Sequence, residues 1–222
     1  PTAMPYGSVY TYQWAQAGEV ENQGIELSAI YRNNSSLFRY RLALNATANR
    51  NKITQLGTEQ VLNDYFRLRE GDQIGDLYDT NGKRLGSTNP DWLFGLKGAM
   101  TYKNWDFDFW IKARLGGEVL SDTERYLDRY GVSQASATAR DTENDLLGIP
   151  APYYFQHKPT EKYVYEATNL RLQRLALTYH FNKISMIKCF RDFSLSLIAD
   201  NVLMLYNKAP FDPELVSGTG TY

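Results

Sequence analysis

The chain has 222 residues, a net charge of −1 at pH 7 and nearly equal numbers of basic and acidic side chains, 24 and 25. This composition excludes the broad basic surface that a nucleic-acid partner requires, so no nucleic-acid binding is expected. The single cysteine, Cys189, cannot form a disulfide within the chain. The sequence contains no run of about 18 apolar residues, so no membrane-spanning helix is expected.

Apolar and polar residues alternate along six segments, which predicts β-strands with one apolar and one polar face. In the clearest of them, WDFDFWIKARL, the charged side chains fall only at even positions. In the fifth segment Leu170 and Leu172 are out of phase with the residues that follow, which predicts a bulge near Gln173. The six segments are Gly24 to Arg32, Phe38 to about Lys52, Trp92 to Tyr102, Trp105 to Leu115, Leu170 to Phe181 and Phe193 to Leu205.

The connections between these segments alternate in length. Residues 33–37 and 103–104 form short turns and 182–192 a medium connection, whereas about 54–91 and about 116–169 form long loops. A compact soluble domain rarely has such long connections without structure of their own. Transmembrane β-barrels, in contrast, combine short turns on one rim with long loops on the other. Several segments also reach the roughly 9 to 11 residues that a tilted strand needs to cross a bilayer.

Aromatic side chains flank the short turns on the apolar face. In transmembrane barrels a ring of aromatic residues marks the boundary between hydrocarbon and headgroups. We therefore expect a membrane girdle at this rim. Its residues are Tyr31, Phe38, Tyr102, Trp105, Tyr179, Phe181 and Phe193.

The apolar faces of the long segments carry no Lys, Arg, Asp or Glu. A cation on the lipid face at mid-membrane costs roughly 2 to 4 kcal/mol, so a lipid environment would select against it. The pattern therefore predicts an all-β fold, an antiparallel transmembrane β-barrel with lipid outside and water inside. A soluble antiparallel sheet with one solvated face alternates in the same way and is the alternative fold.

The polar face of the predicted strands is expected to form the lumen wall. Opposite charges on this face, such as those of Lys97, Asp108 and Lys112, are expected to pair across neighbouring strands. The lumen-wall residues are Arg39, Arg41, Asn45, Lys97, Thr101, Asp108, Trp110, Lys112 and Arg114.

Motifs for catalysis or metal binding are not found. The only histidines, His157 and His180, do not stand with Ser, Cys or carboxylate residues as in a catalytic triad. DTNGKRLGSTNP (residues 79–90) begins like a calcium loop, but Lys83 and Pro90 occupy positions where oxygen ligands are required. We therefore expect no enzymatic activity, no cofactor and no metal site.

Five blocks of sequence carry a family resemblance. They are AQAGEVENQGIELSAIYRN (15–33), REGDQIGDLYD (69–79), STNPDWLFGLKGAMTYKNWDFDFWIKARLGGEV (87–119), NLRLQRLALTYHF (169–181) and ADNVLMLYNKAPFDPEL (199–215). Together they resemble the SusC/RagA-type TonB-dependent outer-membrane transporters, and they stand in the order found in that family. They extend over most of the chain.

The resemblance implies that residues 1–222 belong to one β-barrel domain, the C-terminal segment of a barrel of about 22 strands. The N-terminal plug domain, the TonB-contacting segment and the final strand of the family are expected to lie outside this chain. The implied function is active import of an oligosaccharide or peptide across the bacterial outer membrane. The implied partners are a SusD-like surface lipoprotein, TonB and outer-membrane lipid. A soluble glycan-binding module and a passive porin-like channel are the alternative functions.

The second long loop is rich in aromatic residues, which can stack on sugars or pack against a partner protein. Contact with substrate or with a lid protein, and packing of the loop onto its neighbours, are both open. The residues are Tyr126, Tyr130, Tyr153, Tyr154, Phe155, Tyr163 and Tyr165. In the same loop Ser121 and Glu124 match a capping box and Gly131 a helix stop, which predicts a short helix over about 122–130, with an irregular loop as the alternative.

Overall fold

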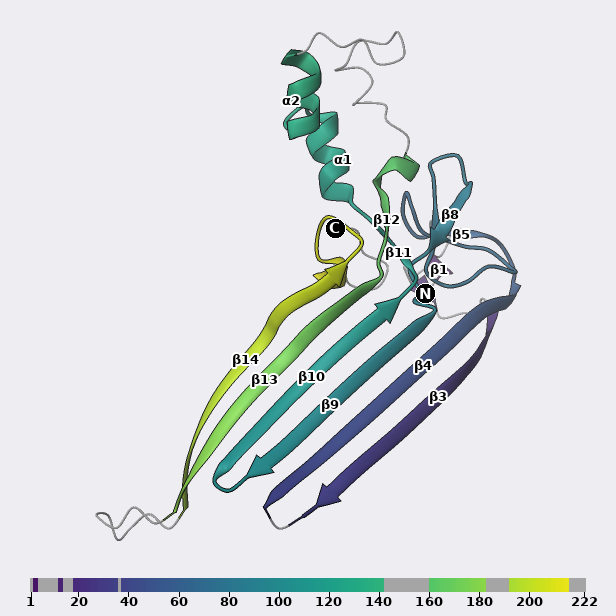
Figure 1. The fold of residues 1–222 in the computed structure, drawn as a ribbon. Coiled ribbons are helices and arrows are strands. Elements are labelled where there is room, and N and C mark those ends of the chain that lie inside the picture. Colours follow the sequence, from purple (N-terminus) through teal and green to yellow (C-terminus); the bar gives the residue numbers. More distant parts are fainter. Residues whose placement is uncertain are drawn as a thin grey trace.

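The computed structural model describes residues 2–3, 12–13, 18–35, 37–141, 160–182 and 192–215. Its main element is a six-stranded antiparallel sheet in the order β14-β13-β10-β9-β4-β3, in which each long strand pairs with the next long strand of the chain (Figure 1). The strands are β3 (Gly18–Asn34), β4 (Phe38–Leu56), β9 (Trp92–Tyr102), β10 (Trp105–Leu115), β13 (Asn169–Asn182) and β14 (Asp192–Asn207). The predicted all-β antiparallel class is confirmed.

The strand bounds follow the alternation of the sequence closely. β9 and β10 begin and end at the predicted residues, whereas β3 begins at Gly18 instead of Gly24 and β4 continues to Leu56. The predicted bulge is also present, because Trp110 pairs with Arg174 and Ile111 with Leu172, which leaves Gln173 outside the register. Period-two alternation therefore located the strands, and only their ends differ.

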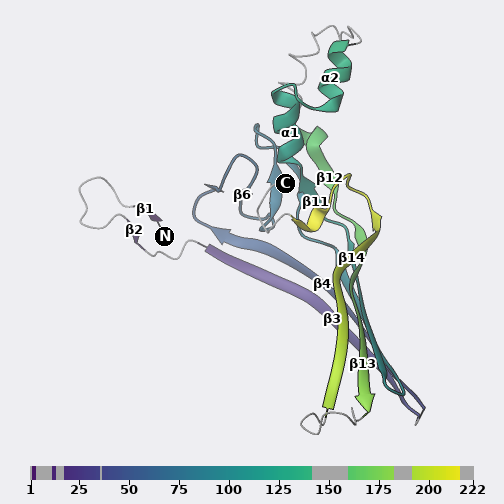
Figure 2. The same ribbon diagram turned by 90° about the vertical axis from the view of Figure 1, so that its left-hand side faces the viewer.

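The connections at the two ends of the strands differ in length as predicted. The short turns lie together at the lower end of the sheet in Figure 1, and both long connections lie at its upper end. The sheet is curved and twisted when viewed from the side (Figure 2). β3 and β14 are its outermost strands, and within the described residues the sheet does not close on itself.

The long connections are folded, which the sequence pattern did not predict. We call their described residues, 57–91, 116–141 and 160–168, the cap. Short strands within the cap pair locally, and a 3₁₀ turn, η1 (Thr160–Tyr163), precedes β12. The pairs are β5 (Gln60–Val61) with β6 (Arg67–Leu68), β7 (Asp76–Tyr78) with β8 (Arg84–Ser87), and β11 (Glu118–Leu120) with β12 (Val164–Glu166). Near the N-terminus, β1 (Thr2–Ala3) pairs with β2 (Tyr12–Gln13).

The principal buried apolar cluster of the described residues lies in the cap and not on the sheet. Tyr65, Phe66, Leu77, Leu120 and Tyr163 are each at most 4% exposed and pack on one another. Two loops that are far apart in sequence thus share one small core. This core explains how the long connections hold a fixed shape, since the burial of apolar side chains offsets the entropy lost on ordering them.

Helix α1 (Asp122–Arg129) begins and ends as its sequence predicts, and α2 (Gln134–Asp141) follows it. The Ser121 side chain accepts a hydrogen bond from the Glu124 backbone N–H, which satisfies a free donor of the first turn. At the other end Gly131 has a φ of 70°, and Val132 N–H donates to the Leu127 carbonyl in a Schellman motif. The predicted short helix is confirmed.

No helix within the described residues is both long enough and apolar enough to cross a bilayer.

Candidate functional site

One face of the sheet is apolar and uncovered. Leu197 on β14 is 74% exposed, Leu27 on β3 is 59% exposed and Phe107 on β10 is 37% exposed. No second layer of described residues covers these side chains, and none of Phe107, Phe109 and Ile111 is buried. A soluble sandwich or barrel would bury such a face in its core.

The aromatic residues beside the short turns lie in register. Phe38 pairs with Tyr102, Tyr102 with Trp105, and Trp105 with Tyr179, so these four side chains form one row across β4, β9, β10 and β13. The Trp105 and Tyr179 ring centroids are 4.6 Å apart. The row continues at the same edge, since Tyr179 contacts Phe181, and Phe181 contacts Phe193.

The aromatic band includes one residue that the sequence prediction missed. Tyr40 lies on the apolar face two residues after Phe38, and its ring centroid is 5.7 Å from that of Tyr31 and 5.6 Å from that of Phe38. It links Tyr31 on β3 to the row that begins at Phe38 on β4. Tyr40 is two residues from Phe38 and so lies on the same face of β4. The alternation that identified Phe38 therefore also identifies Tyr40.

The predicted lumen-wall residues share the opposite face of the sheet. Arg39, Arg41 and Asn45 come from β4, and register places them opposite Thr101, Ala99 and Gly95 of β9. The even-numbered residues of β10 continue these rows. The polar face predicted from alternation is therefore continuous across the middle strands. Within it, Ser28 of β3 donates a hydrogen bond to Asn45 at 2.9 Å.

The polar face contains an open groove of about 560 Å³. Its floor is formed by small side chains, because Ala43, Ala99 and Ala176 lie on three of the strands that cross it. Larger polar side chains stand around this floor. They are Arg41, Lys97, Asp108, Trp110 and Arg174.

Lys97 is held by Trp110 and not by an acid. Its ammonium lies over the Trp110 ring, 4.5 Å from the centroid, in a cation–π contact. Lys112 lies 3.6 Å from the Glu214 carboxylate and 5.5 Å from the Trp110 ring centroid. No ion pair between Asp108 and either lysine is found among the described residues, so the expected pairing is wrong. The indole holds the Lys97 ammonium and Glu214 pairs with Lys112, so neither ammonium is paired with Asp108.

Other charges on this face are paired. The Arg174 guanidinium donates two hydrogen bonds to the Asp200 carboxylate on β14, at 2.5 and 3.1 Å. Near the short turns, His180 Nε2 lies 2.7 Å from Asp106 Oδ2. The alternation placed His180 on the polar face but could not identify its partner, which lies 74 residues away in sequence.

A buried cluster of charged side chains, which we call the charge node, connects the polar face of β13 to the turn after β14. The Arg171 side chain is 5% exposed, and its guanidinium donates to Asp212 and lies 3.6 Å from Glu214. It also donates to the Asn201 side chain at 3.2 Å. The acids follow β14 in the 208–215 turn, which ends in η2 (Pro213–Leu215). The LRL and DPEL segments of two sequence blocks therefore meet here, a contact that sequence reasoning missed.

Arg114, another of the predicted lumen-wall residues, contacts the cap. It is half-buried, and its guanidinium donates to the carbonyls of Thr88 and Gly116 at the base of the cap. Of the predicted lumen-wall residues, it is the one whose contacts are made to loop backbone.

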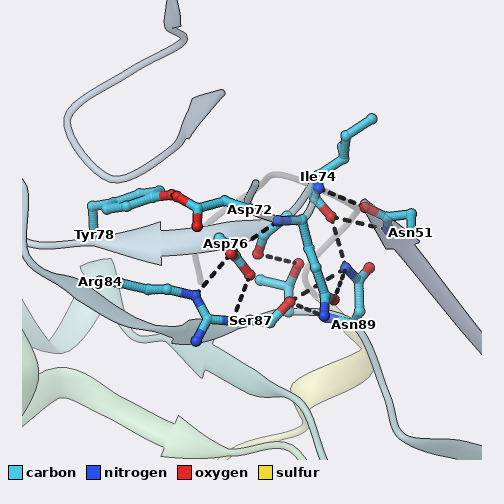
Figure 3. Close-up of polar contacts among 11 residues, drawn as sticks. Asn51, Asp72, Ile74, Asp76, Tyr78, Arg84, Ser87 and Asn89 are labelled. Carbon is cyan, nitrogen blue, oxygen red and sulfur yellow. Dashed lines mark hydrogen bonds and ion pairs between the residues drawn. The ribbon is translucent and has the colours of Figure 1, made fainter. Parts of the chain in front are cut away.

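A second polar network fixes the cap on the upper end of β4 (Figure 3). The Asn51 side chain accepts from Ile74 N–H at 2.6 Å and donates to the Ile74 carbonyl, which also accepts from Asn89 at 2.7 Å. Beside it, Arg84 forms two hydrogen bonds with the buried Asp76, at 2.7 and 2.9 Å. The REGDQIGDLYD block is thus joined to the STNP block by side-chain bonds to backbone.

The cap aromatics occupy different environments. Tyr163 is fully buried and its hydroxyl donates to Asp128 at 3.0 Å, so it packs one part of the loop on another. Tyr165 is half-buried and packs edge-on against Phe211 at 5.6 Å. Tyr126 on α1 and Tyr130 at its C-terminal cap are 46% and 72% exposed, and their rings stack nearly parallel. The remaining predicted contacts, Tyr153, Tyr154 and Phe155, lie outside the described residues.

Burial perturbs several ionisable groups of the cap. Burial, followed by the hydrogen bond to Asp128, raises the pKa of the Tyr163 hydroxyl above its usual range. Burial also raises the pKa of the Glu118 carboxyl, against the smaller opposing effect of Arg84. The described residues contain no grouping of three or more His, Cys, Asp or Glu side chains that could hold a metal ion.

Comparison with known proteins identifies the family. Residues 2–202 match the family model described as TonB dependent receptor-like, beta-barrel. The chain is 26% identical to TonB-dependent receptor P3 of Formosa agariphila, over 96% of this chain and 27% of that protein. It is 24% identical to TonB-dependent receptor SusC of Bacteroides thetaiotaomicron, over 97% of this chain and 26% of that protein.

The fold comparison agrees. A solved structure of the RagAB peptide transporter superposes with a TM-score of 0.71 at 20% identity, and the match covers 98% of this chain and 29% of that one. The chain thus spans roughly a quarter of the length of the curated relatives it matches. The chain belongs to the TonB-dependent receptor β-barrel family, whose members are β-barrel proteins of the bacterial outer membrane.

Proposed function

We propose that this chain forms part of the barrel wall of an importer that takes up a nutrient across the outer membrane, with energy supplied through TonB. The observation that carries the proposal is the two-faced sheet. An uncovered apolar face with an aromatic row at its turn edge fits lipid, and a polar face with a groove fits a solvated passage. Family membership adds the coupling to TonB.

The domain organisation is part of the same proposal. Residues 1–222 contribute strands to one barrel domain of about 22 strands, a size class that carries a plug in its lumen. The described sheet supports this because β3 and β14 both leave an edge open for further strands. The plug and the segment that contacts TonB belong to the remainder of the protein.

The cap supports a role in capture at the outer surface. A SusD-like surface lipoprotein is the proposed partner, and among the described aromatics of the cap Tyr126 and Tyr130 are exposed enough to meet it or the nutrient. Oligosaccharide and peptide are the two proposed nutrient classes. A relative is named SusC, and the superposed structure is of a peptide transporter.

The test is a growth and uptake screen in the organism that encodes the protein. The strain lacking the gene is compared with the complemented strain on single oligosaccharides and single peptides as the sole nutrient. A loss of growth on one nutrient, restored by the gene, together with uptake that a protonophore abolishes, is the expected result.

The alternatives give different results in the uptake screen or during purification. A passive channel would continue to take up its solute after the protonophore is added. A soluble glycan-binding module would remain monodisperse without detergent, whereas a membrane barrel requires detergent. If the gene can be deleted without loss of uptake of any nutrient tested, the proposed function is wrong.

A further inference from the structure

The charge on the polar face is not evenly balanced along its length. Near the cap, Lys112 and Arg171 are matched by Asp212 and Glu214. Toward the short turns, the cations Arg32, Arg39, Arg41 and Lys97 take part in no ion pair among the described residues. Asp108 also lines the groove and forms no ion pair among the described residues, so the four unpaired cations outnumber this one unpaired acid and leave a net positive charge beside the groove.

Arg32 and Arg41 are direct cross-strand partners in the pairing of β3 with β4. Like charges directly opposite on one face of a sheet destabilise it, because their side chains are brought within a few ångströms of each other. Arg39 lies two residues from Arg41 on the same face and adds to the repulsion. An arrangement of this kind is stabilised when an anion lies between the guanidinium groups.

The carboxylates of the neighbouring strands offset these cations only in part. Asp106 shares a row with Arg39, which acts on it electrostatically, but Asp106 is bonded to His180. Asp200 is bonded to Arg174. Asp108 lies in the same row as Arg41 but two strands away, with Ala99 between them. Two strand spacings amount to roughly 10 Å, well beyond ion-pair distance.

Lys97 keeps its full charge because its partner is a ring. The cation–π contact with Trp110 orients the ammonium without cancelling its charge, as a carboxylate would. Gly95 lies beside this indole, since a Cβ there would stand 3.7 Å from Trp110 Nε1. The small residues Ala43 and Ala99 then leave space beside Lys97 and Arg41 for a ligand.

We propose that this groove binds a carboxylate or sulfate group of the imported nutrient, with Arg41 and Lys97 as its principal ligands. The inference rests on the proposed import function and assigns the nutrient to the anionic class, such as an acidic oligosaccharide or an acidic peptide. Guanidinium and ammonium groups that lack an acid partner donate charge-assisted hydrogen bonds to such oxygens.

The binding experiment uses the whole protein in detergent with sodium selenate as the probe. Crystals soaked in selenate are examined for anomalous density, and affinity is measured by calorimetry at low ionic strength. A selenate ion within hydrogen-bond distance of Arg41 and Lys97 is expected. The variant carrying Arg41→Gln and Lys97→Gln should bind at least about tenfold more weakly, because two charge-assisted contacts are lost.

Matched variants separate charge from folding. Lys103→Gln removes a cation at the turn edge, outside the groove, and should leave selenate affinity unchanged. Arg41→Lys keeps the charge and should retain most of the affinity. The proposal is overturned if no anion binds at the groove, if the double variant binds as tightly as the parent protein, or if a carboxylate of the protein's own remaining chain occupies these cations.

The uptake experiment uses the nutrient found in the growth screen. That nutrient should carry carboxylate or sulfate groups, and the double variant should take it up at least about tenfold more slowly at low concentration with an unchanged amount of protein in the outer membrane. A neutral nutrient taken up equally by both proteins would overturn the anion assignment and leave the import function standing. Failure of the screen itself would refute the import function, and the crystal soak would still decide the anion site.

Discussion

Phe109 of β10 lies directly over Gly98 of β9, its register partner on the apolar face. A Cβ added at Gly98 would stand 2.1 Å from Phe109 Cε1, closer than any real contact. We expect Gly98→Ala to force the ring out of place and to lower the free energy of unfolding by about 1 to 3 kcal/mol. The measurement is the guanidinium unfolding midpoint of the whole protein in detergent.

Gly95 is the matched control on the same strand. A Cβ there would meet only Trp110 Nε1, at an ordinary 3.7 Å. Gly95→Ala should therefore leave the midpoint unchanged or raise it slightly, because it reduces the freedom of the unfolded chain. Equal effects of the two substitutions would show that Phe109 does not depend on the space above Gly98.

Phe107 and Asp108 are neighbours on β10 that face opposite sides of the sheet. If the apolar face contacts lipid, Phe107→Lys places a cation in hydrocarbon and should cost roughly 2 to 4 kcal/mol. Asp108→Lys places the same group on the polar face and should have much less effect on stability. Folding into vesicles, followed by heat-modified gel mobility, reports both variants. If Phe107→Lys folds as well as the parent protein and Asp108→Lys does not, the assignment of the two faces is reversed.

Arg171 and Arg174 both lie on β13, but only Arg171 is buried. Replacing each in turn compares the stability lost with a buried ion pair and with an exposed one. Arg171→Met removes the partner of Asp212 from a node in which the arginine is 5% exposed, and we expect a loss of about 3 kcal/mol. Arg174→Met breaks an ion pair whose side chains are 52% and 54% exposed, so the loss should be much smaller, because solvent screens an exposed pair. Unfolding midpoints in detergent give both values. A larger loss at Arg174 would contradict the assigned role of the node.

Glu118 should make the stability of the cap depend on pH. Burial raises its folded-state pKa above the ordinary value of 4.5. The charged form is therefore the less stable one in the folded cap, and stability falls as pH rises from the ordinary value through the folded pKa. We expect Glu118→Gln to slow amide hydrogen exchange of the cap near neutral pH and to remove this dependence, after correction for intrinsic exchange rates.

Glu166 gives the opposite sign and serves as the control. Its hydrogen bond from Lys208 lowers the pKa of its carboxyl, so its contribution is present above the ordinary pKa and is lost as pH falls. Glu166→Gln should therefore speed exchange slightly at neutral pH. If both glutamines change exchange in the same direction, burial of Glu118 is not the cause.

Local patterns of the sequence predicted the sheet well. The alternation in WDFDFWIKARL and its neighbours predicted the strands, their two faces and the bulge at Gln173, and the connection lengths predicted which edge holds the short turns. The capping residues Ser121 and Gly131 predicted α1. These features depend on side chains within a few residues of one another, which is why a single sequence shows them.

Contacts between distant segments could not be read from these patterns. The expected pairing of Lys97 with Asp108 is wrong, because Trp110 holds the ammonium, and Lys112 is paired with Glu214 from a turn far along the chain. The cap was expected as two long loops, yet Tyr65 and Tyr163 from separate loops share one core. No short window of sequence contains both members of such pairs.

The sequence by itself determined where this chain forms strands and which face of each is apolar, because the backbone of a strand turns successive side chains to opposite sides. Only the tertiary structure decided which cations meet an acid and which face the groove unpaired. That outcome depends on the register between strands and on the folding of the loops. Among the described residues it leaves Arg41 and Lys97 without an ion pair, while Arg171 lies beside two carboxylates.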